Sequence, residues 1–449
     1  MQQLYGHKTD RFVKWLGFWL VLILALKIAG FFTWSENVAI TRVFKVISRI
    51  SMTVAIYWIY EMLRARGNIA SFKSTHFFPV FLYFGYLLLG LTSMLWTSDV
   101  GVSALQWIMD FESFVFCWYF IRVVLLLDVF HQHQKLYLSK MMAIAIMLIM
   151  SIFLIGVLVN PDDFYRLTHG GEEARLGGFF MNPNELGMLA CVGISCSYIE
   201  IYEKRNRGMH FTFVLLNIVA LILTGSRSST IGFFLITTYF IMQSDNAKMK
   251  LLVNMGMFLA IPVVLQTIIF KQGDIEEVMS MTGRLPFWTA LLNEGLPKEP
   301  LLGFGFMRIA YRDFFQSVHT YAGQMTHNTF IQVLMNLGFV GLTIVLSQVS
   351  TTVRAFIKEG DKIRKLTFLG IFIPILINSF TEFGIFGETN FGILFYQILI
   401  IYITLEYNFK LDRYNLRTLE LKNASIPLKF GEQLKTNAVL NNSLHTTTA

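Results

Sequence analysis

Apolar segments of lipid length recur along nearly the whole chain, and this feature limits the possible folds most strongly. The first covers residues 12–32, and similar segments follow up to about residue 407. A helix needs about 20 apolar residues to cross the hydrocarbon core of a bilayer. Backbone polar groups in lipid must find partners inside the protein, so such segments fold as helices. We therefore predict an all-α fold, a polytopic transmembrane helical bundle.

Composition excludes an ordinary soluble protein. The 449 residues are 54% hydrophobic and only 15% charged, more apolar surface than a soluble domain can bury. All three cysteines (Cys117, Cys191 and Cys196) lie in apolar stretches, so we expect neither a disulfide framework nor a metal site. No cleavable signal peptide is apparent, because the segment 12–32 is long enough to span and lacks a small-residue cleavage site.

We predict about 12 membrane spans from the apolar segments. A long, partly helical loop, residues 271–326, separates the ninth span from the tenth. Residues 1–408, including this loop, form the predicted transmembrane domain, and residues 409–449 form a polar, disordered tail. The predicted spans are 13–33, 43–63, 77–96, 102–126, 139–159, 183–202, 210–224, 229–243, 249–270, 327–350, 367–382 and 390–407.

The net charge of +8 reflects orientation in the membrane rather than nucleic-acid binding. Short cytoplasmic loops of membrane proteins carry an excess of Lys and Arg. With the N-terminus in the cytoplasm, the basic loops all lie inside, the C-terminus returns inside, and the loop 271–326 lies outside. The residues in these basic loops are Arg64, Arg66, Lys73, Lys135, Lys140, Lys204, Arg205, Arg207, Lys248, Lys250, Arg354, Lys358, Lys362, Arg364 and Lys365.

Three of the predicted outer segments place an arginine beside glycine or serine. They contain Arg175 before Gly-Gly, Arg227 within Gly-Ser-Arg-Ser-Ser, and Arg284 directly after a glycine. A guanidinium offers a forked, charged hydrogen bond, while glycines and helix N-termini expose backbone N–H groups. This combination suits a phosphate or diphosphate. The structural alternative is an arginine that is solvated or bound to lipid headgroups.

Local sequence favours a specific role at two of these positions. Arg227 lies in a very tight turn between two spans, where an unpartnered charge is costly. Thr282 is a candidate N-cap of a short helix that has Pro286 in its first turn and ends at Gly295. Such a helix both anchors the loop at the membrane surface and places Arg284. His327 is either a structural hydrogen-bonding residue or a base.

Charged residues inside the predicted spans have two interpretations. Asp110, Glu112 and Arg122 in the fourth span resemble a proton or ion pathway. The two carboxylates do not share a helical face, and we favour structural pairing with Arg49 or another helix. Glu185 and Glu382 lie near the outer ends of spans, where a role as base or as partner of an arginine competes with simple helix packing.

An ordered set of motifs resembles the bacterial O-antigen ligase and O-antigen polymerase superfamily. The resemblance covers residues 170–345, and in topology the whole chain. It rests mainly on His327-Asn328 followed after nine residues by Gly338 and Gly341. The remaining motifs are Arg175-Leu-Gly-Gly with Asn182-Pro183-Asn184, Ser226-Arg227, Gly283-Arg284 with Trp288, and Pro300-Leu-Leu-Gly303-Phe-Gly305.

The resemblance implies a cofactor-free, metal-independent, inverting glycosyltransferase of the GT-C type in the bacterial inner membrane. The implied donor is an oligosaccharide on undecaprenyl diphosphate, used on the periplasmic side, with a glycan or lipid-linked acceptor. Arg227 and Arg284, with Arg175 as a third residue, would bind the diphosphate, and His327 would activate or orient the acceptor hydroxyl. Four further residues would support them: Asn328, Glu185, Glu382 and Arg312.

The specific reaction stays open among related activities. Arg-x10-Gly pairs are associated with some polymerases, and they occur here at 166/177, 284/295 and 312/323. We therefore favour a polymerase of O-antigen or exopolysaccharide, acting with chain-length regulator or flippase partners, and no nucleic acid. The alternatives are an O-antigen ligase acting on lipid A-core or another acceptor, a lipid-linked-sugar flippase or transporter, and a non-catalytic assembly partner.

Overall fold

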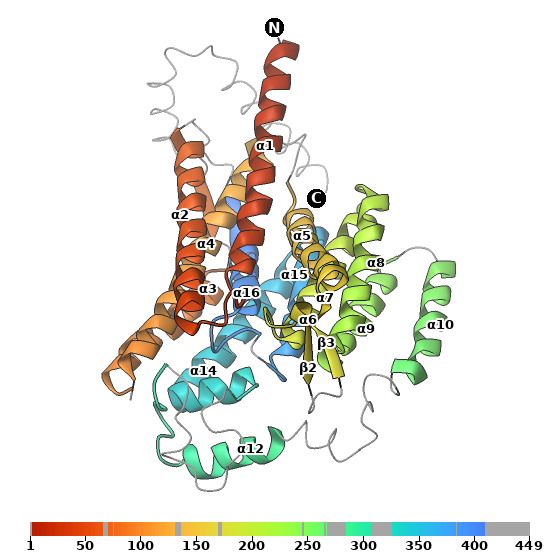
Figure 1. The fold of residues 1–449 in the computed structure, drawn as a ribbon. Coiled ribbons are helices and arrows are strands. Elements are labelled where there is room, and N and C mark those ends of the chain that lie inside the picture. The colour runs from red at the N-terminus through yellow and green to blue at the C-terminus, as the bar shows by residue number, and fades with distance from the viewer. Residues whose placement is uncertain are drawn as a thin grey trace.

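A computed structural model describes residues 2–65, 71–74, 76–97, 99–130, 136–168, 173–244, 247–264, 266, 284–306, 326–382 and 384–408. The predicted C-terminal tail (409–449) and most of the loop 271–326 lie outside these ranges. Helices dominate the described part (Figure 1).

Every predicted span overlaps a helix. By length and composition, six helices of the described part can cross a membrane, so a helical membrane protein is confirmed and the number of spans stays a prediction. The helices are α1 (Gln2–Ala29), α2 (Val38–Ala65), α3 (Phe77–Thr92), α4 (Val100–Phe130), α5 (Leu138–Val159), α7 (Pro183–Tyr202), α8 (Arg207–Thr224), α9 (Arg227–Met242), α10 (Ala247–Val264), α14 (Thr329–Lys358), α15 (Lys362–Asn378) and α16 (Phe391–Thr404).

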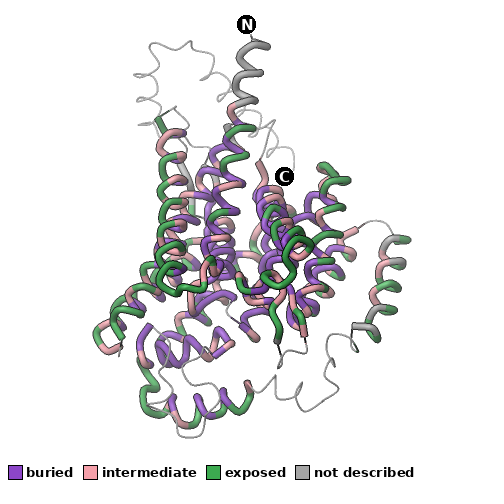
Figure 2. Tube along the Cα trace, viewed as in Figure 1, coloured by how far each residue is buried: buried purple, intermediate pink, exposed green. Residues whose placement is uncertain are grey.

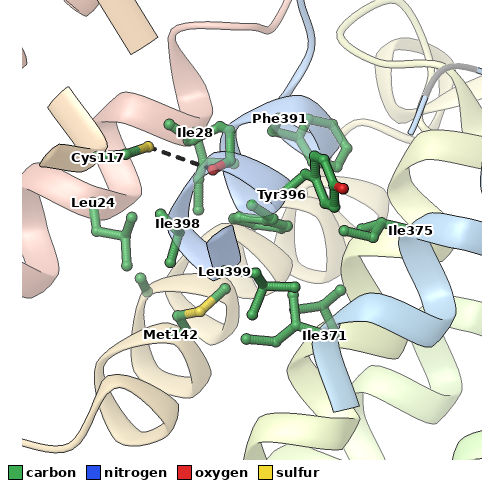
Figure 3. Packing of buried hydrophobic residues seen from close by; sticks show 14 of the residues in the cluster. Leu24, Ile28, Cys117, Met142, Ile371, Ile375, Phe391, Tyr396, Ile398 and Leu399 are labelled. Carbon is green, nitrogen blue, oxygen red and sulfur yellow. Dashed lines mark hydrogen bonds between the residues drawn. The ribbon is translucent and has the colours of Figure 1, made fainter. Parts of the chain in front are cut away.

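The core forms around α16, whose residues are apolar on all sides and almost completely buried. A helix that is hydrophobic all round is stable only inside other helices. Figure 3 shows α16 packed between α1, α4, α5 and α15, with the Cys117 thiol of α4 donating to the Leu394 carbonyl at 3.5 Å. Outer helices such as α2 and α10 instead expose large apolar side chains, as a lipid-facing surface requires (Figure 2).

Two short antiparallel strand pairs depart from the all-α prediction. β1 (Ser71–Ser74) pairs with β4 (Leu405–Asn408), which joins the chain after α2 to the end of α16. β2 (Tyr165–Thr168) pairs with β3 (Glu173–Leu176), which places Arg166 opposite Arg175. Each strand has four residues, too few to give a periodic sequence pattern.

Charged side chains inside the bundle have charged or polar partners. Glu112 of α4 contacts Lys27 of α1 and lies 3.4 Å from Arg49 of α2. Asp110 accepts hydrogen bonds from Tyr83 at 2.9 Å and Gln397 at 2.6 Å. The expected pairing of Glu112 with Arg49 is confirmed, and Lys27 is an additional partner. Buried charges require such partners, because desolvation is costly without them.

The two ends of the bundle differ in charge. At the end where β1 and β4 pair, Arg364 of α15 donates to the Leu405 carbonyl at 3.3 Å and Lys362 contacts Tyr202. The predicted inner basic residues of the described part lie at this end. The opposite end, at the bottom of Figure 1, carries β2, β3, the start of α14 and a short helix, α12 (Arg284–Ala290). The candidate site lies there.

Candidate functional site

A single buried carboxylate, Glu382, organises the candidate site. It lies just after α15, and its side chain is 6% exposed. Its Oε2 is 2.7 Å from Nδ1 of His327. Its Oε1 accepts hydrogen bonds from Arg284 at 3.1 Å and from Asn184 at 2.9 Å. Residues from three separate parts of the sequence therefore meet at one side chain.

The partners of Glu382 keep it ionised. Burial alone raises the pKa of a carboxyl group, because it penalises the charged form. Here the hydrogen bond and charge of His327, and then the charge of Arg284 and the hydrogen bond from Asn184, outweigh burial and lower the pKa of Glu382 to about 2. These partners favour the ionised form of Glu382.

His327 occupies an unusual backbone conformation directly before α14. Its φ is +52°, in the left-handed region that few non-glycine residues adopt. The next residue, Asn328, caps α14: its side chain accepts from the backbone N–H groups of Phe330 at 2.9 Å and Ile331 at 3.1 Å. The predicted supporting residue Asn328 thus fixes the helix start, and His327 projects from the turn before it.

Arg284 begins α12 and reaches across to the segment after α15. It donates to the Thr381 carbonyl as well as to Glu382. Pro286 lies in the first turn as predicted, and a wider helical turn (Leu291–Gly295) ends at the predicted Gly295. The predicted N-cap, Thr282, lies outside the described residues, as does Arg312.

Arg175 reaches the site through Asn184. Its guanidinium donates to Asn184 Oδ1 and to the Thr224 carbonyl, both at 2.7 Å. Burial lowers the pKa of Arg175; the charges of Glu173 and Glu382 partly offset this, and those of Arg227 and Arg166 add to it. Asn184 therefore links a cation to Glu382.

Arg227 lies beside this arrangement at the start of α9. Gly225 ends α8 with φ +57°, and Ser226 is the N-cap of α9, so the predicted tight turn is confirmed. The charge of Arg227 contributes to lowering the pKa of the neighbouring Arg175. The structure thus brings Arg284 and His327 into contact with Glu382, Arg175 next to them, and Arg227 next to Arg175.

Several helices begin at this end of the bundle, and four of those near the site have a polar side-chain cap. The caps are Asn182 for α7, Ser226 for α9, Asn328 for α14 and Asn390 for α16. A helix N-terminus carries partial positive charge from its unpaired N–H groups. Their positive ends add to the arginines, and this favours an anionic ligand.

Glu185 lies on the α16 side of the site. It accepts a long hydrogen bond, 3.5 Å, from Asn390, while its neighbour Asn184 faces Glu382. Within the described residues, Glu185 is thus placed at a junction of α7 and α16, and its role as a base or as a packing residue stays open.

The glycines of two motifs meet at a break in α14. Gly338 has φ +62° and ψ −163°, so α14 is two helices joined by a kink. The segment Pro300–Gly305 fills the break: Phe304 and Gly305 donate to the carbonyls of Met335 and Asn336 at 3.0 and 2.8 Å. A Cβ on Gly338 would lie 2.2 Å from the Leu301 oxygen. Only glycine permits this contact, which ties the outer loop to the helix that carries His327.

Sequence reasoning missed the two groups that complete the site. Asn184 belongs to the motif Asn182-Pro183-Asn184, but the sequence assigned it no role. The Thr381 carbonyl is a backbone group, which no sequence motif marks. Among the described residues, no group of three or more His, Cys, Asp or Glu could hold a metal ion, and the metal-independent reaction stays a prediction.

These features define a helical membrane protein with a cation-rich site, centred on a carboxylate–imidazole pair, at the end opposite its basic loops. The family model described as O-antigen ligase matches residues 212–346. Residues 212–346 are thus similar to the O-antigen ligase family, in agreement with the resemblance that the sequence motifs carry. The matched residues include Arg227, Arg284 and His327. A search of curated proteins gives no match.

Proposed function

We propose that this protein is a polymerase of a bacterial surface polysaccharide. In this proposal it joins oligosaccharide repeat units carried on undecaprenyl diphosphate, by inverting glycosyl transfer at the periplasmic face of the inner membrane. The observation that supports it most is the meeting of Arg284, His327 and Asn184 at Glu382, with Arg175 and Arg227 alongside.

The His327–Glu382 pair suits removal of a proton from a hydroxyl group. With Nδ1–H donating to the carboxylate, Nε2 carries the lone pair that accepts the proton. Glu382 holds the ring in this tautomer and stabilises the imidazolium that forms. In the proposed step the acceptor oxygen bonds to the anomeric carbon while the proton passes to His327.

The arginines suit the leaving group. As the bond between the anomeric carbon and the diphosphate oxygen breaks, its electron pair goes to the diphosphate, and negative charge builds there. Fixed cations near that position stabilise the transition state more than the ground state. A single displacement of this kind inverts the anomeric configuration. Arg284, Arg175 and Arg227 would supply the charge, assisted by the starts of α7 and α9.

The charge distribution along the bundle supports a periplasmic site. The basic loops lie at one end and the candidate site at the other, so the positive-inside bias directs the site outward. Both termini are then cytoplasmic. Lipid-linked repeats are expected at this face, and flippase or chain-length regulator proteins are the proposed partners.

The ligase remains the second candidate, because the same site chemistry serves both reactions. The glycan phenotype of a deletion strain distinguishes them. A missing polymerase leaves single repeat units on the lipid core, whereas a missing ligase leaves long polymer on its carrier. Unchanged surface glycan would contradict both, and accumulation of untransported repeats inside the cell would indicate a flippase.

A further inference from the structure

The imidazole of His327 contacts Glu382 from a residue in the left-handed backbone conformation, which the surrounding structure must hold in place. Such a backbone position is strained for a non-glycine residue, and it persists only where the surroundings enforce it. Asn328 fixes the residue after His327 through the α14 cap. The residue before it, Thr326, is fully buried. Its N–H donates to Gln332 at 3.2 Å and its hydroxyl donates to the Asn328 carbonyl at 2.9 Å, so its own carbonyl is the group left to restrain.

Trp288 supplies that restraint. Its indole N–H donates to the Thr326 carbonyl at 2.7 Å. The Thr326 carbonyl and the His327 N–H belong to one planar peptide unit. A hydrogen bond that fixes this carbonyl therefore also fixes the Thr326–His327 peptide plane, from which φ of His327 is measured. Without it, the contacts of the Thr326 N–H and hydroxyl still hold the turn, but small rotations of the peptide shift the imidazole relative to Glu382.

Trp288 and Arg284 lie one helical turn apart on α12, so they share a face. Arg284 binds the segment after α15, at Thr381 and Glu382, while Trp288 binds the segment before α14. α12 thus bridges the two segments that carry the carboxylate and the imidazole. The spacing Arg-x-x-x-Trp follows from this bridge.

A small apolar core keeps α12 in place. Trp288 packs with Phe287, Leu291 and Met335, and Met335 belongs to the first half of α14. Phe304, from the segment that fills the α14 break, packs against the same cluster. The indole is 8% exposed, so water competes little for its N–H, and the bond to Thr326 is correspondingly strong.

We propose that Trp288 is a positioning residue: its indole N–H holds the Thr326–His327 peptide so that His327 faces Glu382. This inference rests on the proposed glycosyl transfer. Trp288 touches neither substrate nor reacting atoms; it acts through His327. Its loss should therefore slow the chemical step and leave the diphosphate site intact, since Arg284 keeps its own contacts.

The test is Trp288→Phe, which keeps an aromatic ring and removes the N–H. The matched control is Trp107→Phe, because the Trp107 indole also donates to a buried backbone carbonyl, that of Leu87, at 2.6 Å. Three quantities are measured for the purified proteins in vesicles: kcat for glycan transfer, Kd for undecaprenyl diphosphate, and the unfolding temperature.

For Trp288→Phe we expect kcat to fall about ten- to hundredfold, the size of effect that a small misplacement of a catalytic group causes. The Kd should stay within about twofold of wild type, a change of under 0.5 kcal/mol. Trp107→Phe should keep both kcat and Kd. The unfolding temperatures of the two variants should fall by similar amounts.

Two results would overturn the inference: a kcat for Trp288→Phe equal to that of the control, or equal losses in kcat and diphosphate affinity, which would mean general loosening of the site. If Trp288→Phe does not fold, benzothienylalanine at this position keeps the shape of the indole and replaces N–H by sulfur. Absence of transfer by the wild-type protein would refute the proposed function itself.

Discussion

Replacement of Glu382 by glutamine tests the chemistry of the site with the smallest change in shape. The carboxylate accepts from Asn184 and Arg284 at Oε1 and from His327 at Oε2. Glutamine has one oxygen and one NH₂ group. The oxygen should face Asn184 and Arg284, since both donate, which leaves the NH₂ group facing Nδ1 of His327.

This arrangement reverses the tautomer of His327. Nδ1 must then accept from the amide, so the proton moves to Nε2, and Nε2 can no longer take a proton from the acceptor hydroxyl. General base catalysis contributes about 10²- to 10⁴-fold to a rate. We therefore expect Glu382→Gln to lower kcat by about this factor while undecaprenyl diphosphate still binds.

The assay is transfer of a labelled glycan by purified protein in vesicles, with Glu388→Gln as the control. Glu388 lies in the same connection after α15 and accepts from Gln106 at 3.1 Å, so the control removes the same charge without contact to His327. Retention of more than about a third of wild-type kcat by Glu382→Gln would refute the tautomer argument.

The same variant has a pH signature. Because the pKa of Glu382 is lowered from 4.5 to about 2 in the folded protein, ionisation of Glu382 stabilises the fold fully above pH 4.5. This contribution is lost as the pH falls from 4.5 towards 2. The stability difference between wild type and Glu382→Gln should therefore shrink over that range, and a constant difference would contradict the assignment.

Two further substitutions test other parts of the account. Arg284→Lys should lower kcat/KM about tenfold or more, because a lysine cannot reproduce the two-pronged contact with Thr381 and Glu382; equal activity would argue against forked binding. Gly338→Ala should destabilise the protein by about 2 kcal/mol or more, from backbone strain and the clash with Leu301. Gly85→Ala is its control, since a Cβ there meets nothing within 4 Å. Equal unfolding temperatures for the two variants would contradict the close contact between Gly338 and Leu301 at the α14 break.

Helix positions could be predicted from the sequence, because lipid imposes a length and an apolar character that local sequence displays directly. The turn at Gly225–Ser226 was predictable for a similar reason: its two ends are adjacent in the chain. The β1–β4 pair was not, since β4 lies more than 300 residues after β1 and pairing at that distance depends on how the helices pack. The β2–β3 pair is local, but its four-residue strands are too short to give a periodic pattern.

The site was predictable in its residues but not in its connections. Motif order pointed to Arg284 and His327. Glu382 was a candidate because a carboxylate near the outer end of a span is costly without a partner such as an arginine. That Arg284 and His327 meet at Glu382, with Asn184 as a further partner, depends on tertiary packing. The break at Gly338 was hidden for the same reason, because the segment that fills it lies about 35 residues earlier in the chain.

Glycan transfer by purified His327→Ala in a chelator-treated, metal-free assay tests the central claim most directly. We expect wild-type transfer without added metal, and loss of transfer in the variant with protein level and undecaprenyl diphosphate binding retained. Near-normal turnover by His327→Ala, or strong inhibition of the wild type by the chelator, would contradict it.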